Sequence, residues 1–100
     1  MQTKEDLVIE KKEKVTLPPR YKVILLNDDF TPFEWVLFLL SNVFHKTAAE
    51  AEAITLTVHE EGSGIVHVYP SKEIAESKTK KANELSRQQG FPLKCVTEKE

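Results

Sequence analysis

The 100-residue sequence has little cysteine, no long apolar run and no excess of positive charge, and each shortage excludes a class of protein. Its single cysteine, Cys95, excludes an internal disulfide framework and is typical of a reducing compartment. No apolar run approaches the ~18 residues of a membrane-spanning helix, and the N-terminus lacks the apolar stretch of a signal peptide. With 14 basic and 16 acidic residues, the chain is not expected to bind nucleic acid. We therefore expect a protein of the cytoplasm or of a cytoplasm-like organelle interior, without membrane association.

The chain is short enough for one small domain, and its composition changes near residue 20. Residues 1–19 mix Lys and Glu without an apolar period and end in two prolines, which predicts a disordered N-terminal arm. The domain of residues 20–100 opens with YKVILL, whose β-branched and apolar residues predict a buried strand.

Helix signals follow in two places. TPFE at residues 31–34 has the form of a capping box with Pro at the first helical position, so a helix is predicted to about residue 44. TAAE at residues 47–50 is a second capping box and predicts a helix to about residue 59, ended by Gly62 and Gly64.

The last third of the chain predicts a strand at GIVHVY, a helix from Ser71 to about Gln89, and a strand at LKCVT. The element order is therefore β-α-α-β-α-β. This order favours an α+β fold, in which a small three-stranded antiparallel sheet carries three helices packed on one face.

The first strand runs into three consecutive polar residues, Asn27, Asp28 and Asp29. A metal site is not favoured, because the chain has no dense ligand motif such as CxxC or HExxH, and no cofactor is expected. An acid–base pair is not favoured either, because adjacent residues of an extended chain point to opposite faces. Cys95 lies in an apolar strand and is interpreted as a small buried residue, so no catalytic residue is assigned.

A receptor for a cation and a simple solvated turn remain as alternatives for this acidic loop. Asn27 and Asp29 share a face of an extended segment, and His59 at the end of the second helix supplies a third acceptor when neutral. Three acceptors suit an ammonium group with three N–H donors. Spacing alone nevertheless favours the turn, because Asn and Asp are common turn residues.

Longer stretches add a family resemblance. YKVILLNDDFTPFEWV closely resembles the signature of the ClpS adaptors, which reads as an apolar strand, NDD, an aromatic, TP, Met, Glu and an aromatic with Val. TVHEEG, SKEIAESK and FPLKCVTEK resemble later motifs of that family in the same order. The resemblance covers about residues 19–99, nearly the whole predicted domain.

The resemblance implies an adaptor rather than an enzyme. Such an adaptor binds N-degrons, the destabilising N-terminal residues Leu, Phe, Tyr and Trp, and delivers those proteins to the ClpAP protease. The implied partners are N-degron substrate proteins and the N-domain of the ClpA unfoldase. A monomer in the bacterial cytoplasm, or in a plastid interior, is also implied, and the N-terminal arm becomes the segment that the unfoldase engages.

The resemblance also assigns site residues. Those implied for the substrate α-amine are polar and lie in two motifs: Asn27, Asp28, Asp29 and His59. Those implied for the side-chain pocket are mostly apolar: Leu26, Thr31, Phe33, Val36, Thr55, Val58 and Leu93. Those implied for the unfoldase contact lie on the third predicted helix: Glu73 and Lys78.

Two positions depart from the family pattern. Phe33 and Thr55 stand where the family usually has Met, so the ranking of the four N-degron side chains does not carry over unchanged. The α+β layout also resembles the C-terminal domain of the ribosomal stalk protein, a docking module without a ligand pocket. A metal-dependent hydrolase using Asp28, Asp29 and His59 is a more distant alternative.

Overall fold

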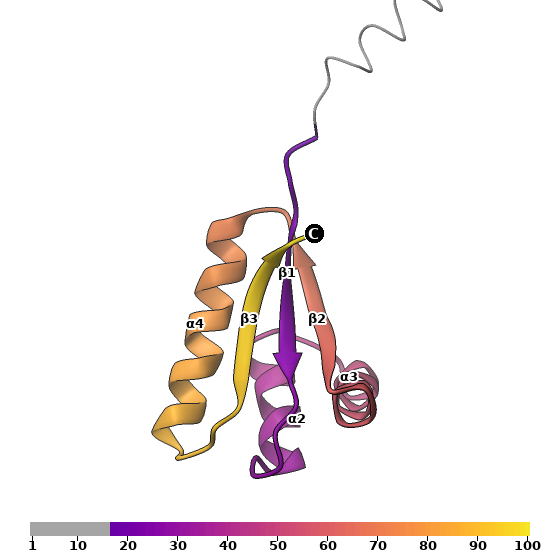
Figure 1. Cartoon of the computed structure of the whole chain (residues 1–100), viewed down its shortest axis with the longest axis vertical. Helices are drawn as coiled ribbons and strands as arrows, with labels where there is room; N and C mark the ends of the chain where they lie inside the picture. The colour runs from indigo at the N-terminus through magenta and orange to yellow at the C-terminus, as the bar shows by residue number, and fades with distance from the viewer. Residues whose placement is uncertain (1–16) are drawn as a thin grey trace, which may run out of the picture.

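The computed structural model describes residues 17–100, and the first sixteen residues of the predicted arm lie outside the described residues. The predicted order of elements is confirmed (Figure 1). The elements are β1 (Tyr21–Leu26), α2 (Phe33–Asn42), α3 (Ala48–Glu61), β2 (Ser63–Tyr69), α4 (Lys72–Gln88) and β3 (Lys94–Lys99).

The sheet has the order β2-β1-β3, with both pairings antiparallel and β1 in the centre. Leu26, the last residue of β1, is paired with Ser63 at the start of β2 and with Lys94 at the start of β3. The loop that follows β1 therefore lies at the end of the sheet where α3 gives way to β2 and where the α4–β3 connection arrives. Three segments that are distant in sequence meet at this end (Figure 1).

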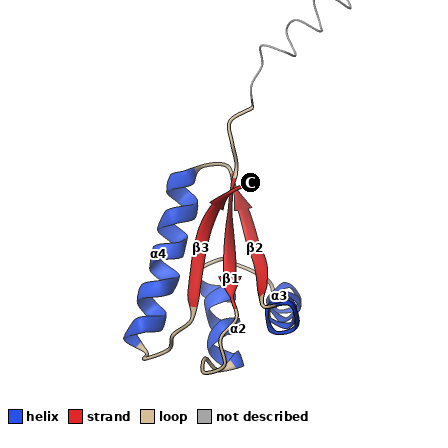
Figure 2. Cartoon of the chain, in the orientation of Figure 1, coloured by secondary structure: helices blue, strands red, loops and turns tan. Residues whose placement is uncertain are grey.

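The helices cover one face of the sheet. Val23 and Leu25 of β1 are buried in a core that includes residues from α2 and α4, whereas Ile65 on β2 is 53% exposed. Successive residues of a strand point to opposite faces, so the Val23 and Leu25 side faces the helices and the other side is open. α4 runs alongside β3, and α3 lies against β2 (Figure 2). The predicted packing of helices on one face is confirmed.

Buried polar groups fix α4 against its neighbours. The Trp35 indole N–H of α2 donates to the Ser86 hydroxyl at 2.9 Å, and this hydroxyl donates in turn to the Ala82 carbonyl. The Asn83 side-chain amide donates to the Cys95 carbonyl at 3.0 Å and accepts from the Cys95 backbone N–H at 2.7 Å. Among the described residues, no buried side-chain nitrogen or oxygen lacks a hydrogen-bond partner, which avoids the free-energy cost of an unpaired group.

The N-caps predicted for α3 and α4 are confirmed, whereas the one predicted for α2 is not. Thr47 forms the predicted capping box at α3, and Gly62 ends this helix with φ of 90°. The capping box predicted at residues 31–34 is wrong, because Pro32 occupies the N-cap of α2 and the Thr31 hydroxyl donates to Asp28 instead. Gly64, the first residue of the predicted strand GIVHVY, lies within β2, which begins one residue earlier at Ser63.

Candidate functional site

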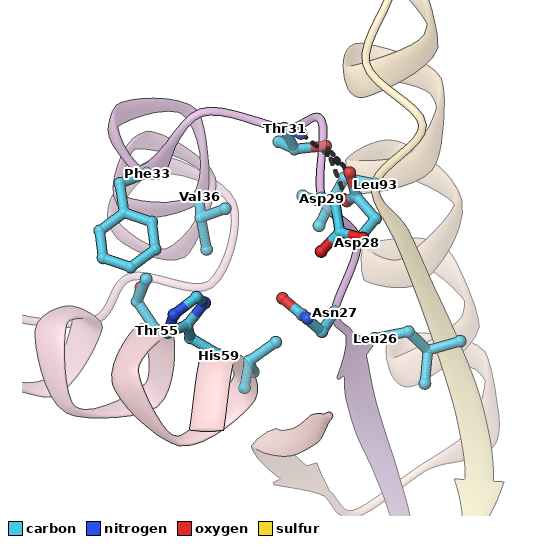
Figure 3. Close-up of a pocket in the computed structure, with 11 residues that line it drawn as sticks. Leu26, Asn27, Asp28, Asp29, Thr31, Phe33, Val36, Thr55, His59 and Leu93 are labelled. Atoms are coloured by element: carbon cyan, nitrogen blue, oxygen red, sulfur yellow. Dashed lines mark hydrogen bonds between the residues drawn. The ribbon is translucent and has the colours of Figure 1, made fainter. Parts of the chain in front are cut away.

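A cavity of about 250 Å³ opens at the end of the sheet where β1, α3 and the α4–β3 connection meet. Its lining comes from β1, the acidic loop, the first turns of α2, the second half of α3, and the residue before β3 (Figure 3). The lining residues are Leu26, Asn27, Asp28, Asp29, Thr31, Phe33, Val36, Thr55, Val58, His59 and Leu93. All the residues predicted for the amine and for the side-chain pocket are therefore brought together.

Hydrogen bonds within the acidic loop fix its shape. The Asp28 carboxylate accepts from the backbone N–H groups of Phe30 and Thr31, both at 2.8 Å, and from the Thr31 hydroxyl at 2.8 Å. An Asp side chain that binds the backbone two and three residues ahead stabilises a turn. The Asn27 backbone N–H also donates to the Gly62 carbonyl at 2.9 Å, which joins the loop to the end of α3.

These hydrogen bonds control the charge of Asp28. Partial burial raises the pKa of its carboxyl, but the Thr31 hydroxyl and the two backbone N–H groups outweigh burial, so the pKa is lowered overall. Asp28 is therefore a stable anion at neutral pH. Because its oxygens already accept several donors, its main contribution to the cavity is negative potential and loop geometry.

Three other polar residues of the cavity keep their side chains available. Within residues 17–100, Asn27, Asp29 and His59 have no side-chain hydrogen bond, and Asp29 has no ion pair. Asn27 reaches across the cavity toward the His59 ring from the opposite side (Figure 3). An amide oxygen, a carboxylate and a neutral imidazole nitrogen are all acceptors, so this end of the cavity suits a donor-rich cation.

The opposite end of the cavity is apolar. Val36, Val58 and Leu93 are buried, and Thr55 is only 3% exposed. The Thr55 hydroxyl donates to the Ala51 carbonyl at 2.7 Å, so its single proton is already used and the group can only accept from a ligand. Leu26 was also predicted as a wall residue and lines the cavity, but its side chain points away from the other labelled residues (Figure 3).

Phe33 stands at the mouth of the cavity and is 46% exposed. Its ring meets the His59 ring edge to face, with centroids 5.6 Å apart and an interplanar angle of 84°. This contact joins the first turn of α2 to the last turns of α3, and so couples a pocket wall to one of the polar acceptors. Sequence reasoning missed it, since nothing in the spacing shows that residues 33 and 59 touch.

Gly64 contributes to the cavity without lining it. A Cβ atom built on Gly64 would lie 3.0 Å from Cγ2 of Val58, which is closer than ordinary van der Waals contact. The missing side chain lets α3 approach β2 and places Val58 in the cavity wall. The sequence shows a glycine at residue 64, but it does not show that this residue lies against Val58.

The two residues predicted for the unfoldase contact lie on α4, outside the cavity. Glu73 is exposed in the first turn of this helix. The Lys78 ammonium donates to the Val43 carbonyl at 2.9 Å, just beyond the end of α2. Lys78 therefore ties two helices together, whatever else its side chain contacts.

Among the described residues, neither a metal-ligand cluster nor a thiol that ionises readily is found. No group of three metal-ligating side chains occurs among residues 17–100. Burial raises the pKa of the Cys95 thiol to about 12, which keeps it from acting as a thiolate at neutral pH. Among the same residues, no helix has the length and apolarity to cross a membrane. Acceptors beside apolar walls suit an ammonium group attached to an apolar side chain.

Comparisons with known proteins agree with this geometry. The family model for the ATP-dependent Clp protease adaptor protein ClpS matches residues 16–96. An ATP-dependent Clp protease adapter protein ClpS from Nautilia profundicola is 50% identical over 91 residues, which cover 91% of this chain and 93% of that protein. Another from Nitrosomonas eutropha is 49% identical over 94 residues, with 93% and 90% covered. The solved structure of Agrobacterium tumefaciens ClpS2 bound to L-phenylalaninamide has a TM-score of 0.80 and 43% identity, covering 83% of this chain and 99% of that one.

Proposed function

Because the chain belongs to the ClpS family of ATP-dependent Clp protease adaptor proteins, we propose that it binds destabilising N-terminal residues and delivers their proteins for degradation. The cavity carries the proposal, since it joins free acceptors to apolar walls of side-chain size. L-Phenylalaninamide, the ligand of the related Agrobacterium protein, has a free α-amine and an amidated carboxyl group, as does the first residue of a protein. The expected residues are Leu, Phe, Tyr and Trp.

In this proposal, Asn27, Asp29 and His59 hold the α-amine of the substrate. Each charge-assisted hydrogen bond contributes on the order of 1.5–3 kcal/mol. Asp28 adds negative potential and keeps the loop in place through its bonds to Phe30 and Thr31. An acetylated N-terminus has lost both its charge and its donors, so it is not expected to bind.

The first side chain of the substrate enters the apolar end of the cavity, between Val36, Val58 and Leu93. Burying a large apolar side chain contributes roughly 1.5–3 kcal/mol. Together with the amine contacts, this supports micromolar affinity, about −8 kcal/mol, when the site is rigid beforehand. The internal bonds of the acidic loop supply this rigidity.

Delivery requires a second surface. We assign it to the exposed side of α4 around Glu73, with Lys78 contributing through the position that its bond to Val43 gives it. The proposed partner is the N-domain of a ClpA-type unfoldase, which then engages the N-terminal arm of residues 1–19. The monomeric state, the cytoplasmic location and the absence of catalytic activity remain predictions.

A titration with a Phe-initiated peptide and its acetylated twin tests the function. We expect only the free peptide to bind, and to be recovered intact. If neither peptide binds, the result supports a docking module like the stalk domain, an alternative that the cavity does not favour. If the peptide is consumed, the result indicates a hydrolase.

The amine contacts are tested by Asp29→Ala. The variant loses a charge-assisted hydrogen bond worth on the order of 1.5–3 kcal/mol, so we expect roughly a tenfold or larger loss of affinity for the Phe-initiated peptide, measured by fluorescence anisotropy. Glu60→Ala is the matched control, because this exposed carboxylate of α3 does not line the cavity. Unchanged affinity in Asp29→Ala with an intact fold would remove Asp29 from the site.

A further inference from the structure

A second hollow lies on the far side of Phe33 and Thr55, in the groove between α2 and α3. Its volume is about 240 Å³. It shares Phe33 and Thr55 with the first cavity, so these two side chains form the partition between the hollows. The remaining lining residues are Leu37, Glu52 and Leu56.

The lining of this hollow combines an exposed apolar floor with one carboxylate. Leu56 is 51% exposed and Phe33 is 46% exposed, although both are large apolar residues. Glu52 and Leu56 are four residues apart in α3 and therefore lie on the same face of the helix. Within residues 17–100, Glu52 has no ion pair. An apolar floor next to an unpaired anion suits a long alkyl stem that ends in a cation.

We propose that this hollow binds the side chain of the second residue of the substrate, and that Glu52 makes the site prefer Lys or Arg there. The inference rests on the proposed function, because it places the first side chain in the neighbouring cavity. Consecutive side chains of an extended peptide point to opposite sides of its backbone. Two hollows separated by one aromatic ring can therefore hold two consecutive side chains, one on each side of Phe33.

A peptide bound in the first cavity could instead leave it in the opposite direction, over Phe30. This residue is 81% exposed and belongs to the acidic loop, but it lines neither hollow. The route over Phe33 is favoured, because the hollow beside it shares two side chains with the first cavity and has the Glu52 carboxylate in its lining. Another hollow shares Leu93 with the first cavity, but its lining contains Arg87 and Lys94 and no carboxylate. The two routes predict that different residues of the protein determine the preference for the second residue of the peptide.

Four peptides that differ only at the second residue test the proposal on the full-length protein: Phe-Lys, Phe-norleucine, Phe-Ser and Phe-Glu. Norleucine has an alkyl stem like that of Lys without the ammonium, so the pair isolates the charge. We expect Phe-Lys to bind about three- to fivefold tighter than Phe-norleucine at low salt, the range of an exposed ion pair. Phe-norleucine should bind tighter than Phe-Ser, and Phe-Glu should bind most weakly.

Three variants identify the residues responsible. Glu52→Gln should reduce the ratio between Phe-Lys and Phe-norleucine to near one, whereas Glu60→Gln on the same helix should leave this ratio unchanged. Leu56→Ala should remove the advantage of Phe-norleucine over Phe-Ser. Phe30→Ala should change neither ratio.

The outcomes separate this inference from the proposed function. A charge preference that survives Glu52→Gln, or that disappears in Phe30→Ala, overturns the assignment of the second hollow while leaving N-terminal binding intact. No second-residue preference in the wild-type protein overturns it as well. If no Phe-initiated peptide binds at all, the proposed function fails, and this inference fails with it.

Discussion

Asp28 and His59 act on the same cavity by different means. Asp28 accepts hydrogen bonds from its own loop, whereas the His59 ring lines the cavity and meets the Phe33 ring edge to face. At the scale of the residue, the loop carboxylate therefore determines geometry, and the imidazole offers an acceptor to a ligand.

The charge of Asp28 depends on the Thr31 hydroxyl. Thr31→Val removes this donor, so the pKa of Asp28 should rise toward its ordinary value, as followed by an NMR titration. Because the folded-state pKa is lowered, the stabilisation is full above the ordinary carboxylate range and is lost as the pH falls through the lowered value. Thr79→Val is the control, since the Thr79 hydroxyl pairs with Thr97 far from the loop. An unaltered Asp28 pKa in Thr31→Val would contradict the assigned cause.

Affinity for Phe-initiated peptides should fall in His59→Ala, because this variant loses one of the three acceptors at the polar end of the cavity. Fluorescence anisotropy measures the loss. His67→Ala should keep wild-type affinity, because His67 lies on β2 outside the cavity and contacts Lys46. Equal affinity in His59→Ala and wild type would remove His59 from the site.

At the scale of the element, the cavity depends on the distance between α3 and β2. Gly64 permits this distance, because a Cβ there would lie 3.0 Å from Val58. Gly64→Ala should therefore push α3 outward, cost about 1–3 kcal/mol of unfolding free energy, and weaken peptide binding. Denaturant unfolding and anisotropy measure the two effects. Ser63→Ala at the preceding exposed position should change neither, and a fully stable Gly64→Ala variant with wild-type affinity would show that the contact relaxes freely.

Elements were easier to predict from the sequence than the contacts between them. Apolar periodicity, turn residues and the Thr47 and Ser71 caps gave all six elements in order, because these signals are local. The capping box at Thr31 failed because Asp28, three residues earlier, competes for the same hydroxyl. Family resemblance brought together the residues that line the cavity, yet it gave neither the ring contact of Phe33 nor the second hollow, since both depend on how α2 and α3 pack.

At the scale of the whole molecule, the segment 17–20 that leads into β1 and the cavity lie at opposite ends of this strand. Arg20 and Glu100 form an ion pair at the end where the chain enters and leaves the sheet, and the cavity opens beyond Leu26 (Figure 1). Six residues of strand separate the two ends by about 20 Å. Residues 17–20 therefore lie far from the peptide-binding residues.

Deleting residues 1–17 should spare peptide affinity but reduce degradation of a Phe-initiated model substrate by the assembled protease. The described residues that line the cavity all belong to the domain of residues 20–100, so the anisotropy titration should match wild type. Replacing the same residues with a Gly/Ser segment of equal length separates a need for length from a need for sequence. A loss of peptide affinity on deletion would show that the arm belongs to the binding site.

The side chain of Asn83 protects the edge of the sheet against aggregation. By pairing with both backbone groups of Cys95, it occupies hydrogen-bonding positions along the free edge of β3. Unpaired edges of this kind are templates on which other chains aggregate. A protein that carries clients toward an unfolding machine meets extended polypeptide as part of its work. Asn83 leaves such a chain fewer places to add itself as a fourth strand.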